Sequence, residues 1–220
     1  MKTIDFWFDP ISPYAYLAFE RLPELLVGLS YRVVYRPIVF GALLKHWAHK
    51  GPAEIEPKRQ WTFRQVHWLA HRHGVPIATP ARHPFNPLAL SRLMWACAAE
   101  GTTPSRYVCE TVLRHVWRGE GADAEDAARL RALRTATLTL RFDPDSDGVK
   151  LRLREATAEA IALGLFGVPT MAVDDRLFWG FDSLDMVAAC LRGDAWFDAP
   201  DWQREGEPRV GTVRAERSRS

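Results

Sequence analysis

Hydrophobic positions at the start of the chain alternate with other residues, and this period of two predicts a β-strand. Ile4, Phe6 and Phe8 would share one face of the strand, and the residues between them would share the other. Pro10 ends the strand, because proline lacks the N–H that a sheet interior requires. The chain is therefore expected to open on a short strand that stops near Asp9.

A helix is expected directly after this strand. Ser12 is a favourable N-cap, and Pro13 suits the first helical position, where its missing N–H is not needed. Tyr14, Leu17 and Ala18 then recur at helical spacing. A helix that begins at the end of a strand presents free backbone N–H groups and the positive end of its dipole. Because a hydroxyl held there can donate a hydrogen bond to an anionic oxygen or sulfur, we expect the chemistry of the protein at Ser12.

The rest of the chain is predicted to add a strand, a block of helices and a β-hairpin. Residues 31–38 are predicted to form a second strand, and helical patterns prevail from residue 40 to 164. Residues 170–179 are predicted to form a hairpin, and residues 183–191 a closing helix with Asp182 as its N-cap. The expected order is βαβ, a long helical block, then ββα.

Composition is that of an ordinary globular protein and narrows the class of partners. The 220 residues are 47% hydrophobic and 25% charged, which is enough apolar material for one well-filled domain. The formal net charge is +2 and basic residues are spread along the chain, so nucleic acid is not an expected partner. No apolar run approaches the roughly 20 residues of a membrane span, so no membrane association is expected either.

Three scattered cysteines bear on the cellular compartment. Cys97, Cys109 and Cys190 lie far apart without paired spacing, which is typical of reduced thiols packed in a protein interior. The first residues lead into a strand instead of the basic and apolar segments of a signal peptide. Both features predict a cytoplasmic protein.

Four short motifs, in their order and spacing, resemble those of a known enzyme family. They are Asp9-Pro10-Ile11-Ser12-Pro13-Tyr14, Pro57-Lys58, Gly167-Val168-Pro169-Thr170 and Trp179-Gly180-Phe181-Asp182. Together they are similar to the 2-hydroxychromene-2-carboxylate isomerases, which are related to kappa-class glutathione transferases within the DsbA-like group. The resemblance covers roughly residues 1–198 and implies an α/β fold, namely a thioredoxin-like domain with an inserted all-helical subdomain.

The resemblance divides the chain into a core, an insertion and a tail. Residues 1–39 and 166–198 would form the thioredoxin-like domain, and residues 40–165 the helical insertion. Residues 199–220 are expected to form a disordered tail, because apolar periodicity disappears there. The substrate pocket would then lie between the core and the insertion.

The same resemblance changes the interpretation of the first helix and of the Gly167–Thr170 loop. Disulfide oxidoreductases of this fold begin that helix with Cys-X-X-Cys, whereas this chain has Ser12-Pro13-Tyr14-Ala15 and cannot cycle a disulfide there. The loop proline is cis in the superfamily. We therefore expect a cis bond between Val168 and Pro169, with Pro169 close to Ser12.

Glutathione is the cofactor that the resemblance implies. The residues expected to bind it are Ser12, His49, Lys58, Val168, Pro169, Asp182 and Ser183. Ser12, the expected catalytic residue, matches the serine whose hydroxyl faces the glutathione sulfur, and Lys58 matches the lysine that pairs with a glutathione carboxylate. Val168 would bind the cysteinyl backbone, and Asp182 the γ-glutamyl end. His49 departs from related transferases, where asparagine is common at this position.

A small aromatic carboxylate is the substrate that the resemblance implies. The residues expected to line its pocket are Lys45, Arg82, His83 and Asn86. The thiolate of glutathione would add to ring-opened 2-hydroxychromene-2-carboxylate and a bond would rotate. Elimination would then give trans-o-hydroxybenzylidenepyruvate and return the cofactor. Because kappa-class relatives are dimers, a homodimer is expected as well.

Two other functions remain open from the sequence. A kappa-like glutathione transferase would consume glutathione in a stable conjugate. A non-catalytic thioredoxin-like module would bind a thiol or a peptide without turning it over. Ser12 would be no more than a helix N-cap in the simplest interpretation, in which it contributes about 1 kcal/mol to stability.

No metal is expected in this chain. Residues 143–148 imitate the first half of a calcium-binding loop, but Arg154 stands where the bidentate glutamate is required. His67 and His71 have the spacing of a zinc pair, but no nearby glutamate completes a zinc-protease motif. A turn before a capped helix and a solvated helix face explain these two patterns.

Overall fold

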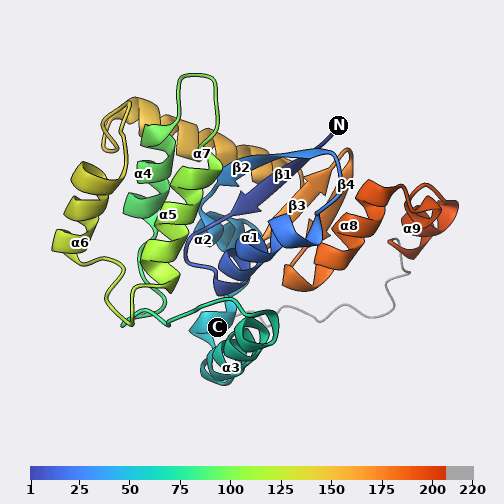
Figure 1. The fold of residues 1–220 in the computed structure, drawn as a ribbon, viewed down its shortest axis with the longest axis horizontal. Helices are drawn as coiled ribbons and strands as arrows, with labels where there is room; N and C mark the ends of the chain where they lie inside the picture. The colour runs from blue at the N-terminus through green and yellow to red at the C-terminus, as the bar shows by residue number, and fades with distance from the viewer. Residues whose placement is uncertain (207–220) are drawn as a thin grey trace, which may run out of the picture.

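A four-stranded mixed sheet forms the centre of the fold in the computed structural model, which describes residues 1–206 (Figure 1). The strands are β1 (Lys2–Phe8), β2 (Tyr31–Pro37), β3 (Thr170–Val173) and β4 (Arg176–Trp179), in the order β2-β1-β3-β4. β2 runs parallel to β1, whereas β3 is antiparallel to both β1 and β4. The predicted βαβ and ββα units therefore meet in one sheet, with β1 in its interior.

Helix α1 (Pro13–Leu25) connects β1 and β2 and begins as the sequence predicts. Ser12 is its N-cap, with an extended backbone, and Pro13 occupies the first helical position. The block between β2 and β3 contains α2 (Phe40–His46), α3 (Glu56–His73), α4 (Leu88–Cys97), α5 (Arg106–Trp117), α6 (Ala127–Ala132) and α7 (Asp147–Ala162). The hairpin is followed by the 3-10 turn η3 (Phe181–Ser183) and by α8 (Leu184–Arg192).

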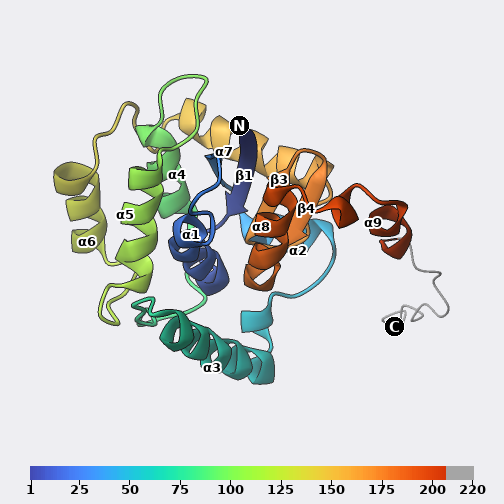
Figure 2. The same ribbon diagram turned by 45° about the vertical axis from the view of Figure 1, so that its right-hand side comes forward.

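Helices cover both faces of the sheet, so the alternation along β1 separates two apolar clusters. Ile4, Phe6 and Phe8 are fully buried and share one cluster with residues of α1 and α5. Trp7 points to the opposite face, where it packs with apolar residues of α2 and α7. In Figure 2, α1 and α8 lie in front of the strands and α7 lies behind them. β1 is therefore a central strand that is buried on both sides.

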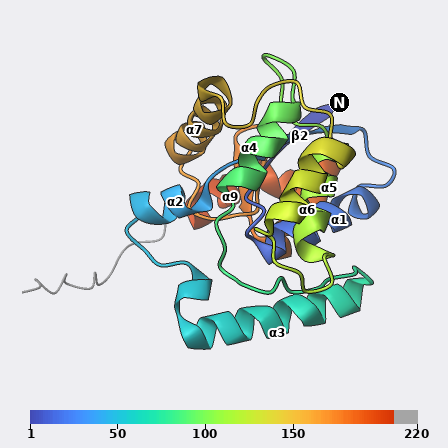
Figure 3. The same ribbon diagram turned by 90° about the vertical axis from the view of Figure 1, so that its left-hand side faces the viewer.

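Helix α3 runs along the margin of the molecule, away from the sheet (Figure 3). Of its residues, Val66 and Ala70 are buried. Tyr14 Oη donates to Gln65 Oε1 at 2.6 Å, which connects α1 with α3. Most of the surface of α3, including Lys58 in its first turn, faces solvent.

Asp182 does not have the capping role that the sequence analysis assigns to it. The closing helix begins at Leu184, and its N-cap is Ser183, which makes no side-chain cap bond. Asp182 lies inside the preceding turn η3, because the chain tightens into a 3-10 conformation before the helix starts. The prediction of an Asp182 N-cap is therefore wrong.

The segment after residue 199 is partly helical, where disorder was expected. It contains α9 (Pro200–Glu205). The ring of Trp202 lies 5.3 Å from that of Phe197, which is itself buried. This aromatic contact explains the order, because it supplies a buried surface that no helical periodicity in the sequence reveals. The remainder of the expected tail, residues 207–220, lies outside the described residues.

Three smaller expectations can be compared with the structure. Cys97, Cys109 and Cys190 are free and buried, as predicted. Residues 143–148 form a turn, and Ser146 then caps α7 by accepting from Val149 N at 3.4 Å. Within residues 1–206, no helix combines the length and the apolar character that crossing a membrane requires.

Candidate active site

Ser12 lies between the end of β1 and the start of α1, with 7% of its surface exposed. Its Oγ accepts a hydrogen bond from Ala15 N at 3.2 Å, which is the N-cap bond. Its backbone N–H donates to the carbonyl oxygen of Asp9 at 3.0 Å and closes the turn between strand and helix. The hydroxyl is therefore held at the positive end of α1.

The loop around Pro169 reaches Ser12 from the far end of the sequence. The Val168–Pro169 bond is cis, as predicted. Ser12 Oγ donates to the carbonyl oxygen of Val168 at 3.3 Å. The loop is also fixed from its other side, since Gly180 N donates to the carbonyl oxygen of Pro169 at 2.9 Å. One hydroxyl thus joins the N-terminus of α1 to the cis-proline loop.

Asp182 lies near the same end of α1 and is exposed. Burial raises the pKa of Tyr14, and the charge of Asp182 raises it further. Gly180 has a φ of 94°, and a Cβ there would come within 2.4 Å of Asp182 Oδ1. Ser183 is buried and donates its hydroxyl to the carbonyl oxygen of Gly180 at 2.9 Å. Of the two expected ligands Asp182 and Ser183, Asp182 is therefore the one that solvent can reach.

Lys58 and His49 lie on the helical block and are both exposed. Within residues 1–206, Lys58 makes no hydrogen bond or ion pair. His49 follows α2, and its Nδ1 lies 3.5 Å from the carbonyl oxygen of Lys50. In the described part of the chain, neither side chain is hydrogen-bonded to Ser12. Both are therefore available to an anionic ligand.

His83 is the expected substrate residue that the fold brings next to the Ser12 turn. Its Nε2 lies 2.8 Å from the carbonyl oxygen of Ile11, and because a carbonyl only accepts, Nε2 carries the hydrogen. The other ring nitrogen, Nδ1, is buried and has no partner among the described residues. The rings of Phe63 and Trp117 lie 5.1 and 5.8 Å away. Burial lowers the pKa of His83, so the imidazole is neutral at neutral pH.

The other three expected substrate residues make no hydrogen bond to Ser12 in the part of the chain that the structure describes. Arg82 forms an ion pair with Asp123, on the loop that follows α5. Asn86 Oδ1 accepts from Leu88 N at 3.1 Å, at the start of α4. Lys45 is exposed in the last turn of α2. Arg82 and Asn86 are thus engaged in local contacts, whereas the Lys45 side chain makes no hydrogen bond or ion pair within residues 1–206.

Asp9 is a candidate that the sequence analysis places at the end of the first strand and in the first motif, without a role in the site. Its side chain is fully buried; Oδ1 accepts from Ile11 N at 2.9 Å and Oδ2 from Phe40 N at 2.8 Å. Burial raises the pKa of Asp9 from 3.8 to about 7, although both amide bonds lower it. The bond to Ile11 is a local one that aspartate commonly makes in turns, so the sequence contains a signal for it. The bond to Phe40 depends on the fold.

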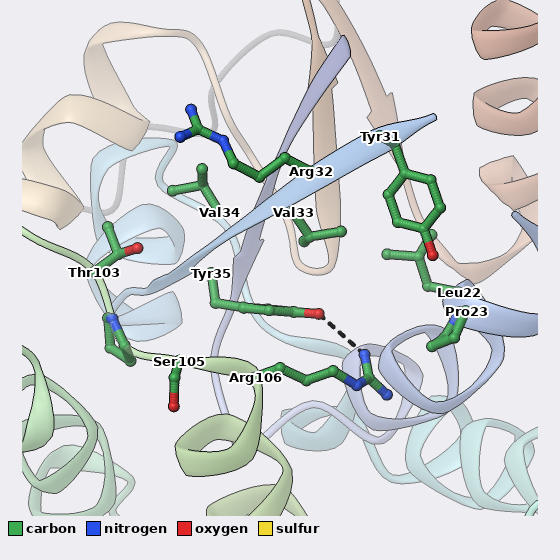
Figure 4. Close-up of a pocket in the computed structure, with 11 residues that line it drawn as sticks. Leu22, Pro23, Tyr31, Arg32, Val33, Val34, Tyr35, Thr103, Ser105 and Arg106 are labelled. Atoms are coloured by element: carbon green, nitrogen blue, oxygen red, sulfur yellow. Dashed lines mark hydrogen bonds between the residues drawn. The ribbon is translucent and has the colours of Figure 1, made fainter. Parts of the chain in front are cut away.

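Two cavities lie elsewhere on the molecule. One of about 500 Å³ lies at the free edge of β2, where Arg106 Nη1 donates to Tyr35 Oη at 3.0 Å (Figure 4). Another of about 600 Å³ borders α7 and is lined by Arg152 among others. Neither cavity includes Ser12 or Val168. We place the candidate site at the Ser12–Val168 contact, because the helix N-terminus, the hydroxyl and the cis-proline loop meet there.

Comparisons with known proteins relate the chain to two kinds of enzyme. The family model described as a DSBA-like thioredoxin domain matches residues 3–192. A 2-hydroxychromene-2-carboxylate isomerase from Sphingobium xenophagum is 32% identical over 200 residues, which cover 86% of this chain and 98% of the relative. Glutathione S-transferase kappa 2 from Caenorhabditis elegans is 28% identical over 206 residues, which cover 86% and 92%. A solved 2-hydroxychromene-2-carboxylate isomerase has a TM-score of 0.74 and 26% identity, covering 89% of this chain and 97% of that structure.

Proposed function

The chain belongs to the DsbA-like thioredoxin family and, within it, to the 2-hydroxychromene-2-carboxylate isomerases, and on this premise we propose that it is a glutathione-dependent isomerase. The proposed reaction interconverts 2-hydroxychromene-2-carboxylate and trans-o-hydroxybenzylidenepyruvate, a step of aromatic degradation. The relatives that cover most of the chain carry the names of isomerases and glutathione transferases, so they are enzymes.

The hydrogen bond between Ser12 and Val168 is the observation that carries the proposal. The backbone of Val168 can offer its N–H and C=O to an extended thiol peptide, in the manner of an added strand. The hydroxyl of Ser12 points at the same place, at the N-terminus of α1. A sulfur bound there would receive the hydroxyl hydrogen that Val168 now accepts. The donors present therefore suit an anionic thiol.

Ser12 and α1 would stabilise negative charge on that sulfur. A hydrogen bond to a charged group contributes about 1.5–3 kcal/mol, and the helix terminus adds about 0.3–1 kcal/mol. Both effects lower the pKa of a thiol at this position. When bound, glutathione would supply the thiolate that adds to the substrate double bond and leaves again after rotation about that bond.

The remaining residues would hold the two ends of the tripeptide. Lys58 and His49 would meet carboxylates, since both are exposed and free of competing acidic partners in residues 1–206. Asp182 would form an ion pair with the ammonium group at the γ-glutamyl end of glutathione. Ser183 would keep the turn in place through its bond to Gly180. Pro169 would present the loop backbone next to Val168.

The proposed substrate, a small aromatic carboxylate, would bind beside His83. Phe63, which is partly exposed, lies beside that imidazole and would supply apolar surface, whereas Trp117 on its other side is fully buried. Lys45 would offer a cation to the carboxylate. Arg82 would first have to leave Asp123, and Asn86 would have to leave the backbone of Leu88, before either could join them.

The stoichiometry of glutathione tests the proposed activity. Purified protein would be mixed with 2-hydroxychromene-2-carboxylate, with and without catalytic amounts of glutathione, and both compounds would be quantified. We expect isomerisation that requires glutathione but leaves its amount unchanged. Loss of one glutathione per product would instead identify a transferase, which the kappa relatives make the main alternative. Absence of any glutathione binding by calorimetry would favour a non-catalytic module.

We also propose a homodimer in the cytoplasm. Trp61 and Trp68 are exposed on α3, and large exposed aromatic side chains are common at interfaces. The free, buried cysteines suit a reducing compartment. Light scattering at micromolar concentration tests the assembly, and a monomer would contradict it.

A further inference from the structure

Asp9 connects two segments that the proposed site requires. Its Oδ1 accepts from Ile11 N, inside the turn that ends at Ser12, and its Oδ2 accepts from Phe40 N, the first residue of α2. Val39, the N-cap of α2, makes no side-chain cap bond. The carboxylate of Asp9 therefore takes the capping position from another part of the chain. One buried side chain thus joins the turn before α1 to the start of α2.

The other polar contacts of this turn come from neutral donors. Trp117 Nε1 donates to the carbonyl oxygen of Pro10 at 2.9 Å, and His83 Nε2 donates to that of Ile11 at 2.8 Å. These two bonds are available to a neutral indole and a neutral imidazole. The two bonds of Asp9 differ, because both need an accepting oxygen. A protonated carboxyl has a hydroxyl in place of one carboxylate oxygen, so one amide would keep only a weaker, uncharged acceptor.

We propose that Asp9 is a positioning residue, whose ionised carboxylate holds Ser12 in place for the reaction by anchoring its turn to α2. Protonation weakens the bond to Ile11 N or to Phe40 N and loosens the fixed relation between Ser12 and Val168. The inference rests on the proposed function, in which the Ser12 hydroxyl acts on the cofactor. Asp9 itself is fully buried, and within residues 1–206 its carboxylate is hydrogen-bonded only to backbone amides, so it acts through the turn.

The surroundings of Asp9 place the midpoint of its protonation near neutral pH. Burial raises its pKa to about 7, and the amide bonds oppose that rise. The titratable side chains on the segments around it are Lys2 and Asp5 on β1, Tyr14, Tyr16, Glu20, Arg21 and Glu24 on α1, Lys45 and His46 on α2, and His83 on the loop before α4. None of them is among the causes of the pKa shift. The titration is therefore a property of the buried turn and not of a charged neighbour.

Turnover against pH in the Asp9→Asn variant tests the proposal. Asparagine keeps the size of the side chain but stays neutral, and its NH2 group faces one of the two amides. We expect wild-type turnover at saturating glutathione to rise with a midpoint near pH 7. Asp9→Asn should be about tenfold slower at about pH 8, as for one lost hydrogen bond to a charged group, and should lack this midpoint.

Asp5→Asn is the matched control for that experiment. Asp5 lies on β1, the strand that leads into Asp9, but its carboxylate pairs with Arg36 and makes no hydrogen bond to the turn. We expect the pH profile of Asp5→Asn to keep the wild-type midpoint. If Asp9→Asn has the turnover and the pH profile of Asp5→Asn, the proposal is overturned.

A second measurement needs neither activity nor a variant that folds. The amide NMR signals of Ile11, Ser12 and Phe40 in the wild-type chain should shift together across neutral pH, with one midpoint near 7. Signals that do not titrate would overturn the anchoring role of Asp9. If the signals titrate together but the chromene is not turned over, the proposed function fails while the anchor stands.

Discussion

Ser12 Oγ and the carbonyl oxygen of Val168 lie 3.3 Å apart, although 156 residues separate them in the chain. The same oxygen accepts the N-cap bond from Ala15 N at 3.2 Å. Because the cap uses a lone pair and the bond to Val168 uses the hydrogen, the two contacts are compatible. A sulfur could replace Val168 as the acceptor without disturbing the cap. The serine can therefore stabilise the helix and serve a ligand at once.

Gly180→Ala is expected to displace Asp182 as well as to strain the backbone. Gly180 has φ 94° and ψ 166°, a conformation that costs other residues roughly 1–3 kcal/mol. Its new Cβ would come within 2.4 Å of Asp182 Oδ1, so the carboxylate must move. We expect glutathione to bind about fivefold more weakly, as for one lost exposed ion pair. Calorimetry measures the dissociation constant, and urea unfolding measures the stability.

Gly28→Ala separates these two effects. Gly28 also has a positive φ, 82°, but a Cβ there would have open space around it. This control should lose roughly 1–2 kcal/mol of stability and keep the wild-type affinity for glutathione. Equal affinities of the two variants would show that Asp182 does not belong to the binding site.

Lys58→Met is expected to weaken glutathione binding without changing the stability of the fold. The side chain is exposed, so an ion pair with a glutathione carboxylate would contribute up to about 1 kcal/mol, or about fivefold in affinity. The difference from wild type should shrink as salt is added. Arg64→Met, at another exposed position of α3, is the control and should bind glutathione as wild type does. A wild-type affinity in Lys58→Met would exclude Lys58 from the site.

Asp9 should make the stability of the fold depend on pH. Its pKa is about 7 in the folded protein, whereas the ordinary value of an aspartate side chain is 3.8. Folding therefore takes up a proton at pH values between these two. The stability that Asp9 contributes is complete below the lower value and is lost as the pH rises through about 7. Relative to Asp9→Asn, the wild-type free energy of unfolding should fall by up to about 1.4 kcal/mol per pH unit in this window. Urea unfolding at several pH values measures it, and a constant difference would contradict the pKa.

Local signals in the sequence were sufficient for the strand–helix junction. The alternation of Ile4, Phe6 and Phe8 and the Ser12-Pro13 start concern neighbouring residues, and both are confirmed. The cis bond at Pro169 is confirmed as well, but only the resemblance to a family could indicate it. Periodicity gives no information about the isomer of a peptide bond.

Contacts between segments that lie far apart in the chain could not be predicted from the sequence. The bonds from Asp9 to Phe40 and from His83 to Ile11 arise because the helical block folds back onto the Ser12 turn. The cis bond before Pro84 was not foreseen either. Asn86 is a different case: it stands two residues before α4 and accepts from Leu88 N, so a local bond at the helix start explains it more simply than a substrate role.

The central claim, that Ser12 stabilises a glutathione thiolate, is tested by replacing that hydroxyl. The ultraviolet absorbance of the thiolate reports the pKa of bound glutathione, and turnover at saturating glutathione reports its use. In Ser12→Ala we expect that pKa to rise by about 1–2 units and turnover to fall roughly tenfold to hundredfold. Stability should fall by only about 1 kcal/mol, the contribution of an N-cap. If the titration and the turnover match those of the wild type and only stability is lost, Ser12 is a helix cap and the account of the site is wrong.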